Sequence, residues 1–201
     1  MSDVAVLAIG PHDDWRASGA DAGVAAVATV ASLAEIRDAA RGLDAPLVWL
    51  VDSGATPSAG ALRALLDAAH TPVASLPVDD RRAPIEAVLG RFADSDKLAV
   101  LDAVSRGCVP LRHTHVISLL VERGALLEHA PPDAALGRYA GSEWTARVFA
   151  RTPGMLVPAS TVRPRTWAPG MPRDALRMTR TGVWRRGETL RELQRSLVGG
   201  R

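Results

Sequence analysis

Asp52 is the carboxylate that the sequence best places for chemistry. It directly follows the apolar run Leu47-Val-Trp-Leu-Val51, which is typical of a strand buried on both faces of a parallel sheet. Ligands of open α/β sheets bind at the carboxyl ends of such strands, so Asp52 is a candidate ligand-binding residue. Asp-Ser-Gly is also a good turn sequence, and a purely local role in a turn stays open.

Two histidines and the single cysteine offer further chemistry. His113 and His115 are spaced i, i+2, so both side chains point to the same face if this segment is a strand. No other histidine, cysteine or acid stands near them in a recognisable ligand pattern, and we therefore do not predict a metal site there. Cys108 has no sequence-level partner that would activate it, which favours a buried free thiol over a nucleophile.

The elements that must position these residues alternate between strands and helices, which is typical of an α/β layer fold. Continuous apolar runs bounded by Gly, Pro or Asp indicate strands, and apolar spacings of three and four residues indicate helices. Two prolines in residues 71–78 indicate an edge strand or an extended connection. Ser58 is the predicted N-cap of the helix that follows it. The predicted strands and short apolar segments are 4–9, 24–30, 47–51, 71–78, 98–104, 109–111 and 155–158. The strongly apolar stretch 116–127 leads into a helix predicted to start near residue 122, and the other predicted helices are 33–41, 58–69, 84–92, 139–150, 173–180 and 187–198.

The composition is that of an ordinary globular chain. The 201 residues are 47% hydrophobic, and 24 Lys and Arg oppose 22 Asp and Glu for a net charge of +2. Disordered chains combine low hydrophobicity with high net charge, and membrane-spanning chains need apolar runs of roughly 18 residues, so both classes are excluded. A single cysteine rules out an intramolecular disulfide and indicates a reducing compartment.

Charge is distributed unevenly along the chain. Residues 163–201 hold ten arginines against three acids, a local balance of +7, which leaves −5 for residues 1–162. Three leucines at helical spacing give the last predicted helix a narrow apolar stripe. Such a tail best suits docking on the acidic body of the same or a neighbouring chain, next a membrane surface, and least a nucleic acid.

Two parts of the chain together resemble a known enzyme family. Residues 48–66, VWLVDSGATPSAGALRALL, combine a buried strand, an acidic motif and a P-x-x-G-A-L-x-x-L-L helix. Residues 143–147, EWTAR, are followed by residues 154–160, GMLVPAS. The first part is similar to the D-x-D region of family-2 glycosyltransferases of the GT-A fold. The second is similar to their acceptor half, where an acidic motif opens a helix with a characteristic arginine and a G-x-x-x-V-P-x-S strand follows. The order and spacing agree across residues 24–163.

The resemblance implies a fold and a division of the chain. It implies the α/β class, with a reduced GT-A, Rossmann-like sandwich around a mostly parallel central sheet and a basic C-terminal helical extension. We expect residues 1–163 to form the GT-A-like domain, with a shortened nucleotide-binding half because Asp52 comes after only 51 residues. We expect residues 164–201 to form a proline-containing linker and an arginine-rich helical tail.

The metal site of the family is degraded in this sequence. Family members neutralise the leaving diphosphate with Mg²⁺ or Mn²⁺, which is held by carboxylates and often by a histidine from the later strand. The D-x-D motif here is Asp52-Ser53-Gly54, and Val162-Arg163 stands where that histidine is often found. We therefore expect no metal cofactor. Arg163 is expected to neutralise a diphosphate directly, because a guanidinium pairs with phosphate but cannot ligate a metal.

The resemblance also implies roles for three residues of the second part. Glu143 is the candidate general base for an acceptor hydroxyl, and the alternative is an acid in the first helical turn that favours the helix dipole. Trp144 is either a platform on which the acceptor sugar stacks or, in the interpretation we favour, a core residue. Arg147 is the characteristic arginine and is expected to bind substrate.

The sequence thus predicts a glycosyltransferase-like protein of the nucleotide-sugar-dependent family-2 type with weak or lost catalysis. If active, it is a hexosyltransferase with Asp52 and Glu143 as catalytic residues. The alternative is a non-catalytic GT-A-fold partner or binding subunit that docks through its basic tail. We expect a nucleotide sugar as ligand, a protein partner or homo-oligomer, and a cytoplasmic location, with residues 164–201 available to a membrane surface. A nucleic acid partner is not expected.

Overall fold

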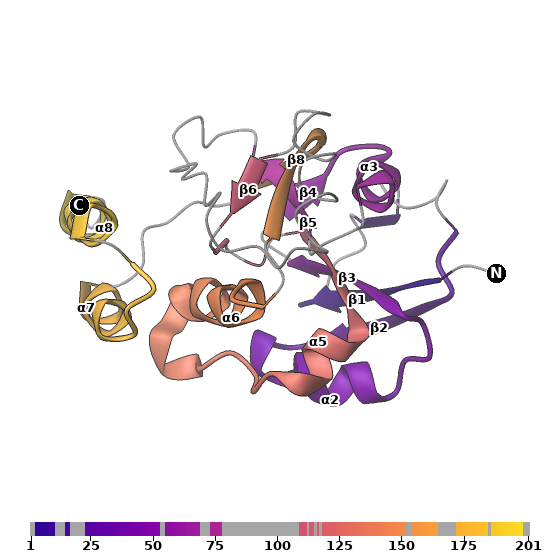
Figure 1. Cartoon of the computed structure of the whole chain (residues 1–201), viewed down its shortest axis with the longest axis horizontal. Coiled ribbons are helices and arrows are strands. Elements are labelled where there is room, and N and C mark those ends of the chain that lie inside the picture. The colour runs from indigo at the N-terminus through magenta and orange to yellow at the C-terminus, as the bar shows by residue number, and fades with distance from the viewer. Residues whose placement is uncertain are drawn as a thin grey trace.

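A mixed β-sheet with helices on both faces forms the centre of the molecule (Figure 1). Eight strands in the described part of the chain join in the order β2-β1-β3-β7-β5-β8-β4, and β6 pairs with β8. The computed structural model describes residues 3–10, 15–16, 23–52, 55–68, 73–77, 109–111, 113–114, 116, 118–151, 154–164, 172–184 and 186–198. The strands are β1 (Val4–Ile9), β2 (Ala26–Val30), β3 (Leu47–Asp52), β4 (Ala55–Pro57), β5 (Val73–Pro77), β6 (Val109–Leu111), β7 (Ser118–Glu122) and β8 (Gly154–Pro164).

Five of the eight described strands share one direction. β2, β1 and β3 are parallel neighbours, and β5 is parallel to β8. β7 lies between β3 and β5 and is antiparallel to both, so β3 and β5 point the same way. β4 and β6 are antiparallel to β8. The predicted α/β class is confirmed, and the sheet is mixed because β7, β4 and β6 run against their neighbours.

The central strand β3 is buried on both faces. Its residues Val48, Trp49, Leu50 and Val51 have no exposed surface. Alternate side chains of a strand point to opposite faces, so Val48 and Leu50 join one apolar cluster and Trp49 and Val51 join the other. The indole N–H of Trp49 donates a hydrogen bond to Ser118 Oγ on β7 at 2.9 Å, which satisfies the one polar atom of this buried side chain.

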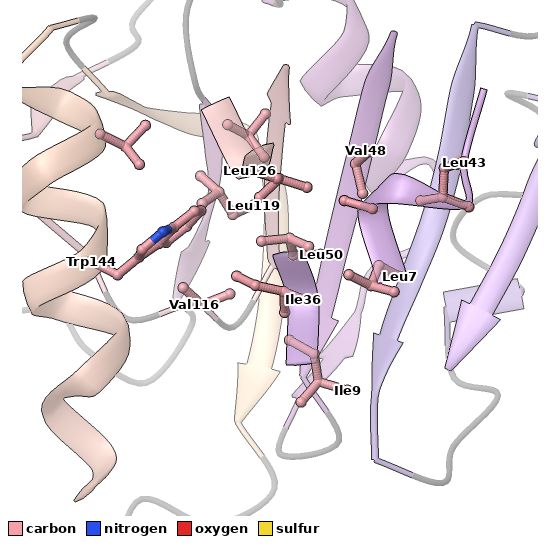
Figure 2. Packing of buried hydrophobic residues seen from close by; sticks show 14 of the residues in the cluster. Leu7, Ile9, Ile36, Leu43, Val48, Leu50, Val116, Leu119, Leu126 and Trp144 are labelled. Carbon is pink, nitrogen blue, oxygen red and sulfur yellow. The ribbon is translucent and has the colours of Figure 1, made fainter. Parts of the chain in front are cut away.

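Helices cover both faces of the sheet. α2, α5 and α6 supply the apolar layer on one face, and α3 supplies the layer on the other (Figure 1). Figure 2 shows Trp144 of α6 pointing into the first layer, towards Leu119 and Leu126. The helices are η2 (Leu33–Glu35), α2 (Ile36–Arg41), α3 (Ala61–Asp67), α5 (Arg123–Glu128), η3 (Ala134–Tyr139), α6 (Ala140–Phe149), α7 (Pro172–Arg180) and α8 (Arg186–Val198).

Two local predictions are corrected by the structure. The segment predicted as an edge strand forms β5, which lies inside the sheet between β7 and β8. Pro77 is its last residue, so the missing N–H of this proline falls at the end of the strand. Ser58 is not the N-cap of α3. Gly60 takes that position with a left-handed φ of 72°, and the carbonyl of Ser58 accepts a hydrogen bond from the Ala61 N–H.

β8 is longer than predicted and is interrupted in the middle. Ser75 of β5 pairs with Val157, whereas the next residue, Leu76, pairs with Thr161. Three residues of β8 are therefore inserted between two paired stretches, and Pro158 is the first of them. A proline lacks the N–H that strand pairing needs, which gives a physical reason for the irregularity at this point.

Several predicted features lie outside the described residues. They are Cys108, His115, the helix 84–92, the segment 98–104 and most of the linker after β8.

The C-terminal extension packs on the body of the same chain. A third apolar cluster joins Ala175 and Met178 of α7 and Trp184 to Leu136 and Tyr139 of η3. The rings of Tyr139 and Trp184 meet edge to face with centroids 4.7 Å apart, a favourable aromatic arrangement. Docking on the same chain, one of the alternatives for the tail, is therefore observed. No helix of the described residues has the length and apolar character needed to cross a membrane.

Substitution of Gly154 tests the packing of α6 on β8. A Cβ at this position would lie 2.2 Å from Cε2 of Phe149, and Phe149 is buried. We expect Gly154→Ala to lower the free energy of unfolding by about 1–3 kcal/mol, the usual cost of overpacking a core. Urea unfolding measures this change.

Gly124→Ala on α5 is the matched control, because a Cβ there meets no atom within 4 Å. Alanine is favoured over glycine within helices, so this control should be neutral or stabilise by up to about 1 kcal/mol. Equal effects of the two substitutions would contradict the packing described here.

Candidate ligand-binding edge of the sheet

Asp52 lies where the order of the parallel strands reverses. β1 has β2, the next strand of the chain, on one side and β3 on the other. Ile9 at the end of β1 pairs with Asp52 at the end of β3. Ligands of open α/β sheets bind outside the carboxyl ends of strands at such a switch point. Gly10 continues β1 with a φ of 85°, a left-handed conformation that glycine adopts without steric cost.

The backbone brings Arg163 towards the same end of the sheet. β4 begins three residues after Asp52, and Thr56 of β4 pairs with Arg163 of β8. An extended chain spans about 3.5 Å per residue, so Thr56 lies within roughly 14 Å of Asp52. The side chain of Arg163 lies outside the described residues, and its expected contact with a diphosphate remains a prediction.

The first half of α6 is anchored beside the segment that leads into β7 at this edge. Thr145 Oγ1 accepts a hydrogen bond from the Thr114 N–H at 2.9 Å and donates one to the Thr114 carbonyl at 2.7 Å. Gly141 approaches so closely that a Cβ there would lie 3.1 Å from the backbone nitrogen of Val116. β7 starts two residues after Val116, opposite the end of β3.

Glu143 and Arg147 form an ion pair on α6. The Nε–H of Arg147 donates to Glu143 Oε1 at 2.7 Å, and a terminal N–H donates to Oε2 at 3.0 Å. Arg147 also donates to the carbonyls of Ala130 at 3.0 Å and Pro131 at 3.4 Å. Both carboxylate oxygens of Glu143 are thus engaged, and the guanidinium of Arg147 holds the connection between α5 and η3. The structure supports a helix-stabilising role for both residues.

The helical period separates Glu143 from the side of α6 that contacts the β7 segment. Gly141 and Thr145 contact that segment, and Glu143 stands two residues from each of them. Successive helical residues are rotated by 100°, so Glu143 projects from the opposite side of the helix. Glu143 therefore points away from the segment that enters β7 opposite the end of β3.

Trp144 is a core residue and has no exposed surface. It packs in the apolar layer between α6 and the sheet (Figure 2). A fully buried ring has no face on which an acceptor sugar can stack, so the platform interpretation is wrong and the alternative interpretation is confirmed.

His113 contacts the C-terminal extension. Its Nε2 lies 3.3 Å from Oε1 of Glu188 on α8, and both side chains are largely buried. The other ring nitrogen, Nδ1, is buried without a hydrogen-bond partner among the described residues. Within the ranges that the structure describes, no group of three His, Cys, Asp or Glu side chains could hold a metal ion.

Two residues of this region were not predicted from the sequence. Gly10 directly follows the predicted strand 4–9, and a Gly-Pro pair after a buried strand is a signal for a sharp change of direction at its carboxyl end. Thr145 gave no signal, because a threonine in a helix is ordinary and its partner, Thr114, is 31 residues away.

No protein-family model matches this chain, and no curated protein sequence matches it. The resemblance to family-2 glycosyltransferases therefore rests on the motifs of the sequence alone.

Arg147 also acts on His129. Burial and, next, the positive charge of Arg147 lower the pKa of His129 from its ordinary value of 6.5. The folded state thus favours neutral His129. The stabilisation associated with this neutral imidazole is therefore fully present above pH 6.5. The free energy of unfolding decreases as the pH falls from 6.5 towards the lowered pKa, because the unfolded chain takes up the proton first.

We expect Arg147→Met to raise the pKa of His129 towards 6.5, because one of its two causes is removed. An NMR titration of the His129 ring protons measures the pKa. Arg41→Gln, which changes an exposed arginine of α2, should leave it unchanged. An unaltered pKa in the Arg147 variant would contradict the electrostatic coupling.

Proposed function

We propose that this chain binds a nucleotide sugar at the carboxyl ends of β1 and β3 and that its glycosyl transfer is weak or lost. The observation that carries the proposal is the position of Asp52 in register with Ile9, at the switch point of the parallel strands. That position is where open α/β sheets bind ligands whatever the family. It is also the position that the resemblance to GT-A glycosyltransferases assigns to the first acid of the D-x-D motif.

A second observation supports binding of a diphosphate. The chain returns from Asp52 through β4 to the end of β8, where Arg163 pairs with Thr56 through the backbone. A guanidinium matches the geometry of phosphate oxygens and stays charged at all physiological pH values. Arg163 would therefore counter the diphosphate charge beside a motif whose second acid is replaced by Gly54.

The state of Glu143 supports weak or lost transfer. A general base must accept the proton of the attacking hydroxyl within hydrogen-bond reach. The two oxygens of Glu143 already accept hydrogen bonds from Arg147, and they project from the side of α6 opposite Thr145. Glu143 would have to leave Arg147 and change direction before it could act as a base.

The alternative is a partner subunit of the same fold that binds no nucleotide and docks through its tail. In this chain the apolar side of the tail, including Trp184, packs on η3. Any partner would therefore meet the outward side of α7 and α8. The two proposals differ in one property, the binding of a nucleotide sugar.

Asp52→Asn tests the proposal in a thermal-shift experiment with a panel of nucleotide sugars. A ligand present at 100 times its Kd stabilises the folded state by about 2.7 kcal/mol, which corresponds to a rise in Tm of roughly 5–10 °C at this chain length. We expect such a rise for the native chain with at least one nucleotide sugar, and a much smaller one for Asp52→Asn.

Asp44→Asn is the matched control, because exposed Asp44 precedes β3 at the opposite edge of the sheet. It should keep the full rise in Tm. No stabilisation by any nucleotide sugar would sink the proposal and leave the partner alternative. A rise that depends on Mn²⁺ would contradict the argument that the cation site is degraded.

A further inference from the structure

Acidic and basic side chains of the two C-terminal helices differ in their exposure to solvent. The described acids of α7 and α8 face the body, since Asp174 and Glu188 are each 8% exposed. Arg173 and Arg180 of α7 are exposed, whereas a terminal N–H of Arg177 donates to the Ala135 carbonyl of η3 at 2.7 Å and so reaches back to the body. On α8, Arg191 is exposed as well. The sequence alone gives this extension a positive charge, and the fold turns that charge outwards.

The buried acids have specific positions. Asp174 packs against Gly137, where a Cβ would lie 2.5 Å from its Oδ2, and the φ of Gly137 is +54°. Glu188 meets His113 from the segment before β7. These contacts hold α7 and α8 against the body, and Arg180 and Arg191 remain exposed on these helices.

Three leucines of the same two helices are exposed as well. Leu176 of α7 is 54% exposed, and Leu190 and Leu197 of α8 are 67% and 68% exposed. Among the described residues the remaining exposed large hydrophobic side chain is Val27 of β2, at 46%. Arg173, Leu176 and Arg180 recur at helical spacing along one side of α7. We define the outer surface as Arg173, Leu176 and Arg180 of α7 and Leu190, Arg191 and Leu197 of α8.

We propose that the outer surface binds an anionic lipid bilayer. Arginines attract lipid phosphates, and exposed leucines gain hydrophobic energy when they enter the boundary between headgroups and acyl chains. A nucleic acid would use the arginines but leave the leucines in water. A second copy bound through the same surface would bring arginines against arginines. The combination of both residue types therefore favours the bilayer.

The charge of the rest of the chain orients the molecule on such a surface. Residues 1–162 carry a net charge of −5, against +7 for residues 163–201. An anionic bilayer repels the first part and attracts the second. The outer surface would therefore face the lipid, and this inference stands independently of nucleotide-sugar binding.

Sedimentation of the full chain with lipid vesicles tests the proposal. The anionic vesicles consist of phosphatidylcholine with 30% phosphatidylglycerol. We expect the chain to bind these anionic vesicles and to bind little to vesicles of phosphatidylcholine alone. The affinity should fall steeply with added salt. The double variant Arg180→Gln/Arg191→Gln should bind the anionic vesicles roughly 25-fold more weakly, about five-fold for each arginine near the surface.

The leucines distinguish a bilayer from other polyanions. Leu190→Gln/Leu197→Gln should weaken binding to the anionic vesicles at least ten-fold and leave binding to duplex DNA unchanged. Two exposed arginines of the body, changed as Arg41→Gln/Arg151→Gln, give the control for charge, and Val27→Gln gives the control for an exposed apolar residue. Neither control should weaken vesicle binding.

Three results would overturn the proposal. The first is no sedimentation with the anionic vesicles at low salt. The second is binding to duplex DNA as tight as to the vesicles, with no effect of the leucine changes on either, which would assign the outer surface to nucleic acid. The third is a native chain that is oligomeric by size exclusion and becomes monomeric when Leu190 and Leu197 are changed, which would assign the surface to a second copy. None of these results depends on a nucleotide sugar, so they are distinct from failure of the proposed function.

Discussion

The burial of β3 on both faces is the constraint on which the rest of the structure depends. Its residues Val48 to Val51 are fully buried, and each points into one of two apolar layers. The apolar run leaves the core only where β3 ends, at the carboxyl ends of the parallel strands. There the polar residue Asp52 pairs with Ile9 at the end of β1. The same apolar run that builds the core therefore places the carboxylate proposed to bind the ligand.

The position of α6 is the second constraint on the candidate site. Trp144 anchors this helix in the core, and Thr145 and Gly141 fix it beside the segment that enters β7. These contacts use the sheet-facing side of α6, so the ion pair of Glu143 and Arg147 falls on the other side. A motif that resembles a catalytic acid and its arginine thus stabilises the helix and the connection before it. The proposed loss of catalysis follows from this division of the helix into two sides.

The sequence predicted most of the described elements because their apolar patterns are strong. The six-residue strand β1, the run in β3 and the boundary between β7 and α5 at Glu122 follow directly from periodicity. The prediction for β5 was wrong, because two prolines indicated a strand at the edge of the sheet. Only the tertiary pairing shows that Pro77 is the last residue of an interior strand. The N-cap of α3 was also misplaced, since the left-handed Gly60 replaces the side-chain cap that Ser58 suggested.

The candidate site was predictable only in part. Asp52 was identified because a strand end is visible in sequence. The pairing of Glu143 with Arg147 was also visible in principle, since residues four apart on a helix are neighbours. The inward direction of Asp174 and Glu188 was not, because it depends on how α7 and α8 dock through Trp184 and Tyr139. The distribution of charged residues along the sequence predicted that the tail is positively charged. It could not predict which of these side chains are exposed to solvent.

The most direct measurement of the central claim is an amide NMR titration of the chain with a nucleotide sugar. We expect chemical-shift changes concentrated at the carboxyl ends of β1 and β3, at Gly10 and Asp52, and at Thr56 of β4. The amides of Asp3, Asp44 and Glu122, at the opposite edge of the sheet, should not move. Shifts confined to that opposite edge, or to α7 and α8, would contradict it.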